Sequence, residues 1–143
     1  MPDGPDAAHV RPDGAADADV AAAGKVSEAL ERLERARGHL YSFHQLMGET
    51  DLMLDDALEL LRDAGRPELA ERLAADLIGR NVLAGRWTFQ VIEEFDDGYW
   101  TVFRDHERAI RDALTDGRRH VFESEMKEAR RTHGRPGHAA RPG

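Results

Sequence analysis

The chain has 143 residues and a formal net charge of −8 at pH 7. It contains no cysteine, which excludes disulfide bonds, thiol nucleophiles and cysteine zinc sites. No apolar run is long enough to cross a bilayer, and no basic segment followed by an apolar one opens the chain. We therefore expect a cytoplasmic protein with no membrane partner, and the length suits one domain.

The charges are divided unevenly along the chain. Residues 118–143 contain seven Arg or Lys and three Glu, a net charge of +4, so a net charge of −12 falls on residues 1–117. An acidic body of this kind repels nucleic acid at long range, whereas the basic segment attracts it.

Both ends of the chain have a composition that favours disorder. Residues 1–24 contain three Pro, three Gly and five Asp, and residues 132–143 read THGRPGHAARPG. Neither segment can bury enough apolar surface to offset the entropy lost on ordering. We therefore predict a disordered acidic tail over 1–24, a single helical domain over 25–131 and a disordered basic tail over 132–143.

The first predicted element is a helix over about 25–64. Positions that alternate by four and three residues form a seam with apolar side chains at eight of its eleven places: Val26, Leu30, Leu33, Arg37, Leu40, His44, Met47, Asp51, Leu54, Leu58 and Leu61. The seam keeps its phase across two glycines, which favours one long helix packed along its length. The alternative is a helical hairpin broken at Gly48, with Thr50 as an N-cap.

A second helix is predicted next. Gly65 is placed to end the first helix, and Pro67 is placed in the first turn of the following one. The spacing of leucines then predicts a helix that extends to Leu83, and the short link makes it antiparallel to the first.

Residues 86–98 fit a helix and a β-hairpin equally well. Trp87, Phe89 and Val91 alternate as in a strand, and Asp97-Gly98 is a hairpin signal. In the helical alternative, one face of the helix continues into the next predicted element. Its residues are Phe89, Ile92, Phe95, Tyr99, Phe103, His106, Ile110 and Ala113.

Two shorter helices, over 99–114 and 118–131, complete the prediction. The expected fold is therefore mainly α, an antiparallel bundle of three or four helices built on the long N-terminal helix.

Common catalytic motifs are absent from the sequence. It contains no GxxxxGK or GxGxxG phosphate loop, no GxSxG elbow and no HExxH. No Glu is followed three residues later by His, which excludes the paired ExxH motif of di-iron bundles.

Polar residues interrupt the seam of the long helix at Arg37, His44 and Asp51, each seven residues apart. One interpretation is a metal site in the bundle core, because imidazole and carboxylate groups bind Zn²⁺, Mn²⁺ and iron. Its candidate ligands for a divalent metal are His44, Asp51, Glu94, Asp97 and His106.

A related interpretation is a pocket for an organic ligand. Arg37 would clamp an anionic group of that ligand through two hydrogen bonds. Trp87, Phe89, Tyr99 and Trp100 would supply the apolar wall that ligand pockets usually have. The candidate ligand-binding residues are Arg37, Tyr41, Trp87 and Tyr99.

A structural interpretation needs no ligand. Isolated polar residues in a helical seam often fix register and partner choice. Arg37 can place its methylenes on the seam and its guanidinium in water. The acidic run EEFDD at 93–97 is then an exposed charged face, or a partner for the basic tail through ion pairs that salt would screen.

Three stretches, YSFHQLMGETD, GRNVLAGRWTFQVIEEFDDGYW and KEARRTHGRPGH, resemble small uncharacterised proteins encoded in high-GC bacteria. That resemblance implies no activity and no catalytic residue.

We predict a non-catalytic binding or assembly protein that engages a protein partner, or a second copy of itself, through its acidic body and basic tail. Nucleic-acid binding by the basic segment 118–143, which includes the tail, is not favoured, because three Glu dilute its charge and only Phe122 offers a stacking ring. The alternative function is a metal- or small-ligand-binding helical bundle, with enzymes included in that class.

Overall fold

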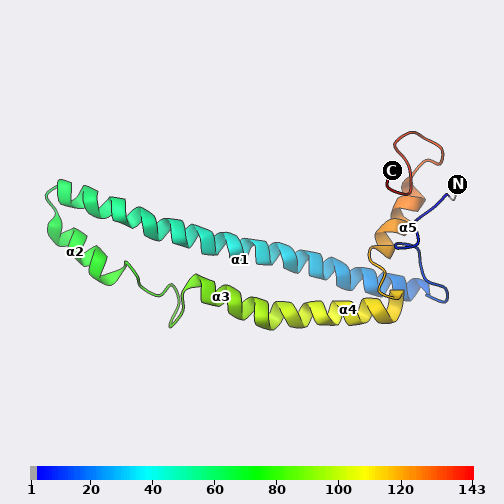
Figure 1. Ribbon diagram of the computed structural model, residues 1–143, viewed down its shortest axis with the longest axis horizontal. Helices are drawn as coiled ribbons and strands as arrows, with labels where there is room; N and C mark the ends of the chain where they lie inside the picture. Colours follow the sequence, from blue (N-terminus) through cyan, green and yellow to red (C-terminus); the bar gives the residue numbers. More distant parts are fainter. Residues whose placement is uncertain (1–2) are drawn as a thin grey trace. The chain divides into compact units, whose positions relative to one another are not determined.

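The structure is a computed structural model that describes residues 3–143 (Figure 1). Every regular element in this range is helical, which confirms the predicted mainly α fold with a long N-terminal helix. The elements are α1 (Asp17–Asp63), α2 (Pro67–Asp76), α3 (Thr88–Phe95), the π-turn η1 (Asp96–Trp100), α4 (Thr101–Thr115) and α5 (Val121–Arg130). Within residues 3–143, no helix has both the length and the apolar character that a bilayer crossing requires.

The chain divides into two compact units, and α1 contributes residues to both. The first unit contains the chain up to Glu34 together with Trp100–Gly143, and the second contains Arg35–Tyr99.

The seam predicted along α1 is confirmed. All eleven of its positions, from Val26 to Leu61, are half-buried or buried. The helix continues through Gly48, so the hairpin alternative is wrong. It ends at Asp63, where Gly65 adopts a φ of +75° and Arg66 N–H donates to the Leu61 carbonyl at 2.8 Å. This is the left-handed glycine stop that the sequence predicts.

The start of α1 lies eight residues before the predicted one, within the segment expected to be disordered. The Asp19 carboxylate accepts a hydrogen bond from Ala16 N–H at 3.0 Å, and an acidic group in the first turn is favourable at a helix N-terminus. Val20 and Ala23 are also buried, at 4% and 6% exposure. The prediction was wrong because Val20 and Ala23 lie close to residues distant in the sequence. They line one small cleft together with Val121 and Phe122, and a Cβ placed on Gly24 would lie 2.9 Å from Phe122 Cβ.

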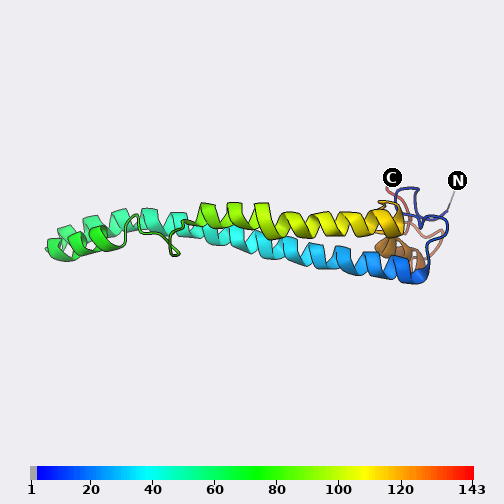
Figure 2. The ribbon, with the colours of Figure 1, turned by 90° about the horizontal axis from the view of Figure 1, so that it is seen from below.

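In the first unit, α4 lies beside the N-terminal part of α1 in both views (Figure 1 and Figure 2). Thr115 is 2% exposed, and its hydroxyl donates a shared hydrogen bond to the carbonyl oxygens of Arg111 and Arg118, which fixes the end of α4. Val121 is buried where α5 begins, three residues after the predicted start.

The two chain ends meet in the first unit, although the sequence predicts disorder for both. Arg131 has a side chain only 2% exposed, and its guanidinium binds Asp3 at 2.5 Å and Glu128 at 2.7 Å. Arg141 donates to the carbonyls of Gly4 and Pro5 at 2.7 and 3.1 Å. These hydrogen bonds, rather than apolar burial, give the ends defined turns.

In the second unit, α2 turns back along the end of α1, as predicted (Figure 1). It stops at Asp76 rather than near Leu83, because Gly79 adopts a φ of +79° and breaks the helix. Residues 77–87 are turns, with a single bridge between Leu83 and Arg86.

The helical alternative for 86–98 is confirmed. The Gln90 side chain accepts a hydrogen bond from Trp87 N–H at 2.8 Å and so caps the start of α3. η1 follows α3, and in α4 two residues of the predicted inward face, Phe103 and Ile110, are half-buried. Glu107 is buried, whereas the predicted inward residue His106 is exposed.

Candidate functional site

The second unit contains a cavity of about 500 Å³ between α1 and residues 77–89. It arises because α2 ends at Asp76 and α3 begins at Thr88, which leaves this part of the α1 seam without a facing helix. Its volume lies within the usual range for small-molecule sites. Most of the accessible wall is apolar and comes from Met47, Leu54, Leu77, Val82, Trp87 and Phe89.

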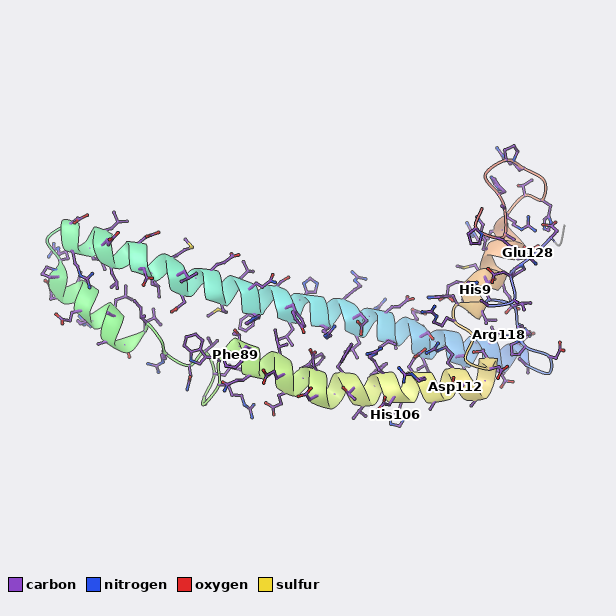
Figure 3. The ribbon with its side chains drawn as sticks, in the orientation of Figure 1. His9, Phe89, His106, Asp112, Arg118 and Glu128 are labelled. Atoms are coloured by element: carbon purple, nitrogen blue, oxygen red, sulfur yellow. The ribbon has the colours of Figure 1, made fainter. Side chains whose placement is uncertain are left out.

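Phe89 lies at the N-terminal end of α3 (Figure 3). Its side chain is 49% exposed and that of Trp87 is 37% exposed, so both rings have surface that a ligand could cover. Both rings were predicted as cavity wall from the sequence, whereas Trp100, also predicted, does not line this cavity.

His44 lies in the cavity wall but is held by the protein itself. Its Nδ1 is 2.7 Å from Thr88 Oγ1, and Thr88 is 6% exposed. This hydrogen bond joins α1 to the start of α3, so it fixes the register of the two helices.

Asp51 is the charged group of the cavity that has no partner. It is half-buried, and no residue within 3–143 forms a hydrogen bond or an ion pair with it. The other charged wall residue, Arg80, pairs with Asp76 at 3.0 Å on an exposed surface. The net unpaired charge of the wall is therefore negative.

Arg37 and Tyr41 converge on Asp96 rather than on the cavity. The guanidinium forms a two-point contact with the carboxylate, and the Tyr41 hydroxyl donates to Asp96 Oδ2 at 2.9 Å. The Arg37 hydrogen bonds hold the pKa of Asp96 below its usual value, and the hydrogen bond to Asp96 raises the pKa of Tyr41. The predicted clamp for an anionic ligand is thus occupied by a carboxylate of the chain itself.

The five predicted metal ligands are not brought together. Glu94 pairs with Arg86 at 2.7 Å, and Asp97 is exposed in η1. His106 belongs to the first unit, and Figure 3 shows it on the side of α4 away from α1. The inward face of α4 passes through Phe103, Glu107 and Ile110, so His106 lies outside it.

Tyr99, the last predicted wall residue, does not line the cavity. Its ring is 61% exposed and stacks on Phe95 with centroids 6.2 Å apart.

One His/carboxylate cluster that the sequence analysis missed lies in the first unit. Glu31, His120 and Glu123 are the one group of three such residues close enough for a common ion within residues 3–143. His120 Nδ1 lies 4.0 Å from Glu31 and 3.8 Å from Glu123, and all three side chains are substantially exposed. These are loose contacts on the surface, where charge interactions contribute little. Sequence spacing could not reveal them, because Glu31 and His120 are far apart in the chain.

The second unit also carries an exposed apolar stripe on α1, here called the outer seam: Phe43, Leu46, Met53 and Leu60. The spacing of three and seven residues places these side chains on one face, and they are 42%, 58%, 69% and 68% exposed. Between residues 38 and 61 the helix carries five carboxylates and no Arg or Lys.

Comparisons with protein-family models, curated proteins and solved structures find no match to this chain.

Proposed function

We propose that the protein is a non-catalytic assembly protein whose outer seam docks a basic amphipathic helix of another protein. The observation that carries the proposal is the outer seam itself, four large apolar side chains on a stretch of helix that has only negative charges. Exposed apolar stripes of this kind typically mark interaction sites.

The spacing of the outer seam suits a helical partner. An amphipathic helix places its anchors at intervals of three, four and seven residues, which matches the positions from Phe43 to Leu60. Docking would cover side chains that now face solvent, and each Å² of apolar surface removed from water contributes about 25 cal/mol before the costs of association.

The charges beside the outer seam favour a basic partner over a second copy. Glu49 lies three residues after Leu46, and Asp56 lies three residues after Met53. Side chains three residues apart are neighbours on a helix surface, so these two carboxylates flank the outer seam. A second copy would bring its own carboxylates against these, whereas Lys or Arg on a partner helix would be attracted.

The basic tail contributes less to this proposal than the acidic body. Arg141 of the tail, and Arg131 immediately before it, are engaged by the N-terminal segment. Nucleic-acid binding through the tail remains the less favoured proposal.

The test uses synthetic helical peptides rather than an unidentified partner. One labelled peptide carries a leucine seam flanked by Lys, and a matched peptide carries the same seam flanked by Glu. Fluorescence anisotropy should show binding of the Lys peptide alone, weakened by added salt. Leu46→Ser and Met53→Ser should each weaken binding about tenfold or more, as expected for interface anchors.

Leu52→Ser is the matched control, because Leu52 is 70% exposed and lies off the outer seam. Equal binding of the two peptides, or an equal loss in the control, would refute the proposal. Analytical ultracentrifugation of the unmodified protein tests whether a second copy of the chain binds the outer seam instead. A dimer that dissociates in the Leu46→Ser variant would assign the outer seam to that second copy.

A further inference from the structure

We propose that the cavity of the second unit binds a small organic cation, a primary ammonium group carried on an aromatic or branched aliphatic body. This inference is independent of the outer seam, because it rests on the inner face of α1 and on residues 77–89.

The apolar part of the ligand follows from the cavity wall. Six apolar side chains provide most of the surface, and two of them, Trp87 and Phe89, are aromatic rings with exposed area. Burial of an apolar body against these rings is favourable, and an ammonium near the indole of Trp87 gains a cation–π contribution.

The charge of the ligand follows from Asp51. Its carboxylate lines the cavity, is half-buried and has no partner within residues 3–143. A carboxylate partly removed from water is stabilised by an ammonium at hydrogen-bonding distance more strongly than an exposed one. An anionic ligand has no comparable site, because Arg80 is already paired with Asp76.

A metal ion fits this cavity less well than an organic cation. His44 is the imidazole of the cavity wall, and its Nδ1 is already hydrogen-bonded to Thr88. Within residues 3–143, Asp51 belongs to no cluster of three His or carboxylate residues that could share a metal ion. One carboxylate in a largely apolar wall matches an ammonium with an apolar body instead.

The experiment compares three probes of the same shape: 4-phenylbutylamine, 4-phenylbutanol and 4-phenylbutyrate. Binding to the full chain is measured from amide chemical shifts in ¹H–¹⁵N NMR spectra. The amine should shift Gly48 and Phe89 and should bind about tenfold more tightly than the alcohol, a ratio equivalent to 1.4 kcal/mol. The carboxylate should bind more weakly than the alcohol.

Asp51→Asn should abolish the preference for the amine while the alcohol still binds. The matched control is Asp55→Asn, which removes the same charge from an exposed position of α1 outside the cavity. It should retain the preference, which separates a specific contact from general attraction of cations to an acidic protein.

Two results would overturn the inference. In the first, the amine binds no better than the alcohol, or Asp51→Asn leaves its preference unchanged. In the second, the Lys peptide that tests the outer seam shifts Gly48 and Phe89 and competes with the amine, which would make a partner's side chain the occupant. Loss of peptide binding without loss of amine binding would refute only the assembly function.

Discussion

Arg37 and Asp96 form a two-point ion pair across 59 positions of sequence. Nε lies 2.8 Å from Oδ1, and Nη2 lies 3.0 Å from Oδ2. The side chains are 24% and 19% exposed, so water screens the pair less than it screens the other ion pairs of the second unit. The polar interruption of the α1 seam at this point is therefore a structural contact that joins α1 to η1.

Removal of Arg37 should destabilise the second unit. Arg37→Met keeps the packing of the side-chain methylenes but removes the guanidinium from Asp96. Of the two side chains Arg37 and Tyr41, only the Tyr41 hydroxyl would then donate to the carboxylate. The free energy of unfolding should fall by about 1–3 kcal/mol, the usual cost of losing hydrogen bonds to a charged group. Urea denaturation followed by circular dichroism measures the change. Arg86→Met, which breaks the exposed pair with Glu94, should have little effect.

The same pair predicts a loss of stability in acid. The pKa of Asp96 is lowered in the folded protein, so above the unfolded value of 3.8 the ionised carboxylate contributes stability. This contribution declines as the pH falls below 3.8 and through the lower folded pKa. Urea midpoints measured from pH 6 to pH 2 should therefore fall less steeply for Asp96→Asn than for the unmodified chain. Parallel curves would contradict the assignment.

Two glycines of α1 should respond to alanine in opposite directions. Gly38→Ala meets no atom within 4 Å, and it should raise the free energy of unfolding by about 0.5–1 kcal/mol through helix propensity. Gly24→Ala would place its methyl 2.9 Å from Phe122 Cβ, so α5 must shift. That displacement should outweigh the propensity gain and give a net loss of about 1 kcal/mol. Thermal melts of both variants measure the difference, and stabilisation by Gly24→Ala would show that the contact with α5 is not tight.

Arg131 should control the order of both chain ends. Arg131→Ala removes the guanidinium that Asp3 and Glu128 share, so the N-terminal segment should exchange its amide hydrogens faster. Hydrogen exchange read by mass spectrometry should show this change over residues 3–10, with α1 unaffected beyond its first turns. The control is Arg135→Ala, an exposed arginine of the same segment. If both variants exchange alike, Arg131 does not hold the ends.

The long helix could be predicted because its signal is local. The alternation of four and three residues from Val26 to Leu61 depends only on neighbouring turns of one helix, and all its positions lie inward. The left-handed stop at Gly65 is equally local. The helical start at Asp17 was missed because Val20 is buried by residues distant in the sequence.

The contacts of the polar seam residues could not be predicted. Arg37 finds Asp96 and His44 finds Thr88 at separations of 59 and 44 residues. Which carboxylate or hydroxyl faces each one depends on how distant segments pack together and on the π-turn, which has no clear sequence signature. The cavity follows from the early end of α2, so the sequence indicated its Trp87 and Asp51 without indicating the space between them.

The π-turn at Asp96–Trp100 has a consequence for how this protein can vary. A helix of 3.6 residues per turn rotates by about 100° for each residue inserted or deleted. At a π-turn one extra residue is already accommodated, so loss of a single residue here would convert η1 into an ordinary α-turn and leave the inward face of Thr101–Thr115 unchanged. Homologues should therefore tolerate a one-residue deletion within Asp96–Trp100, whereas the same deletion within Thr101–Thr115 would rotate the residues that follow it and move Thr115 out of its buried position.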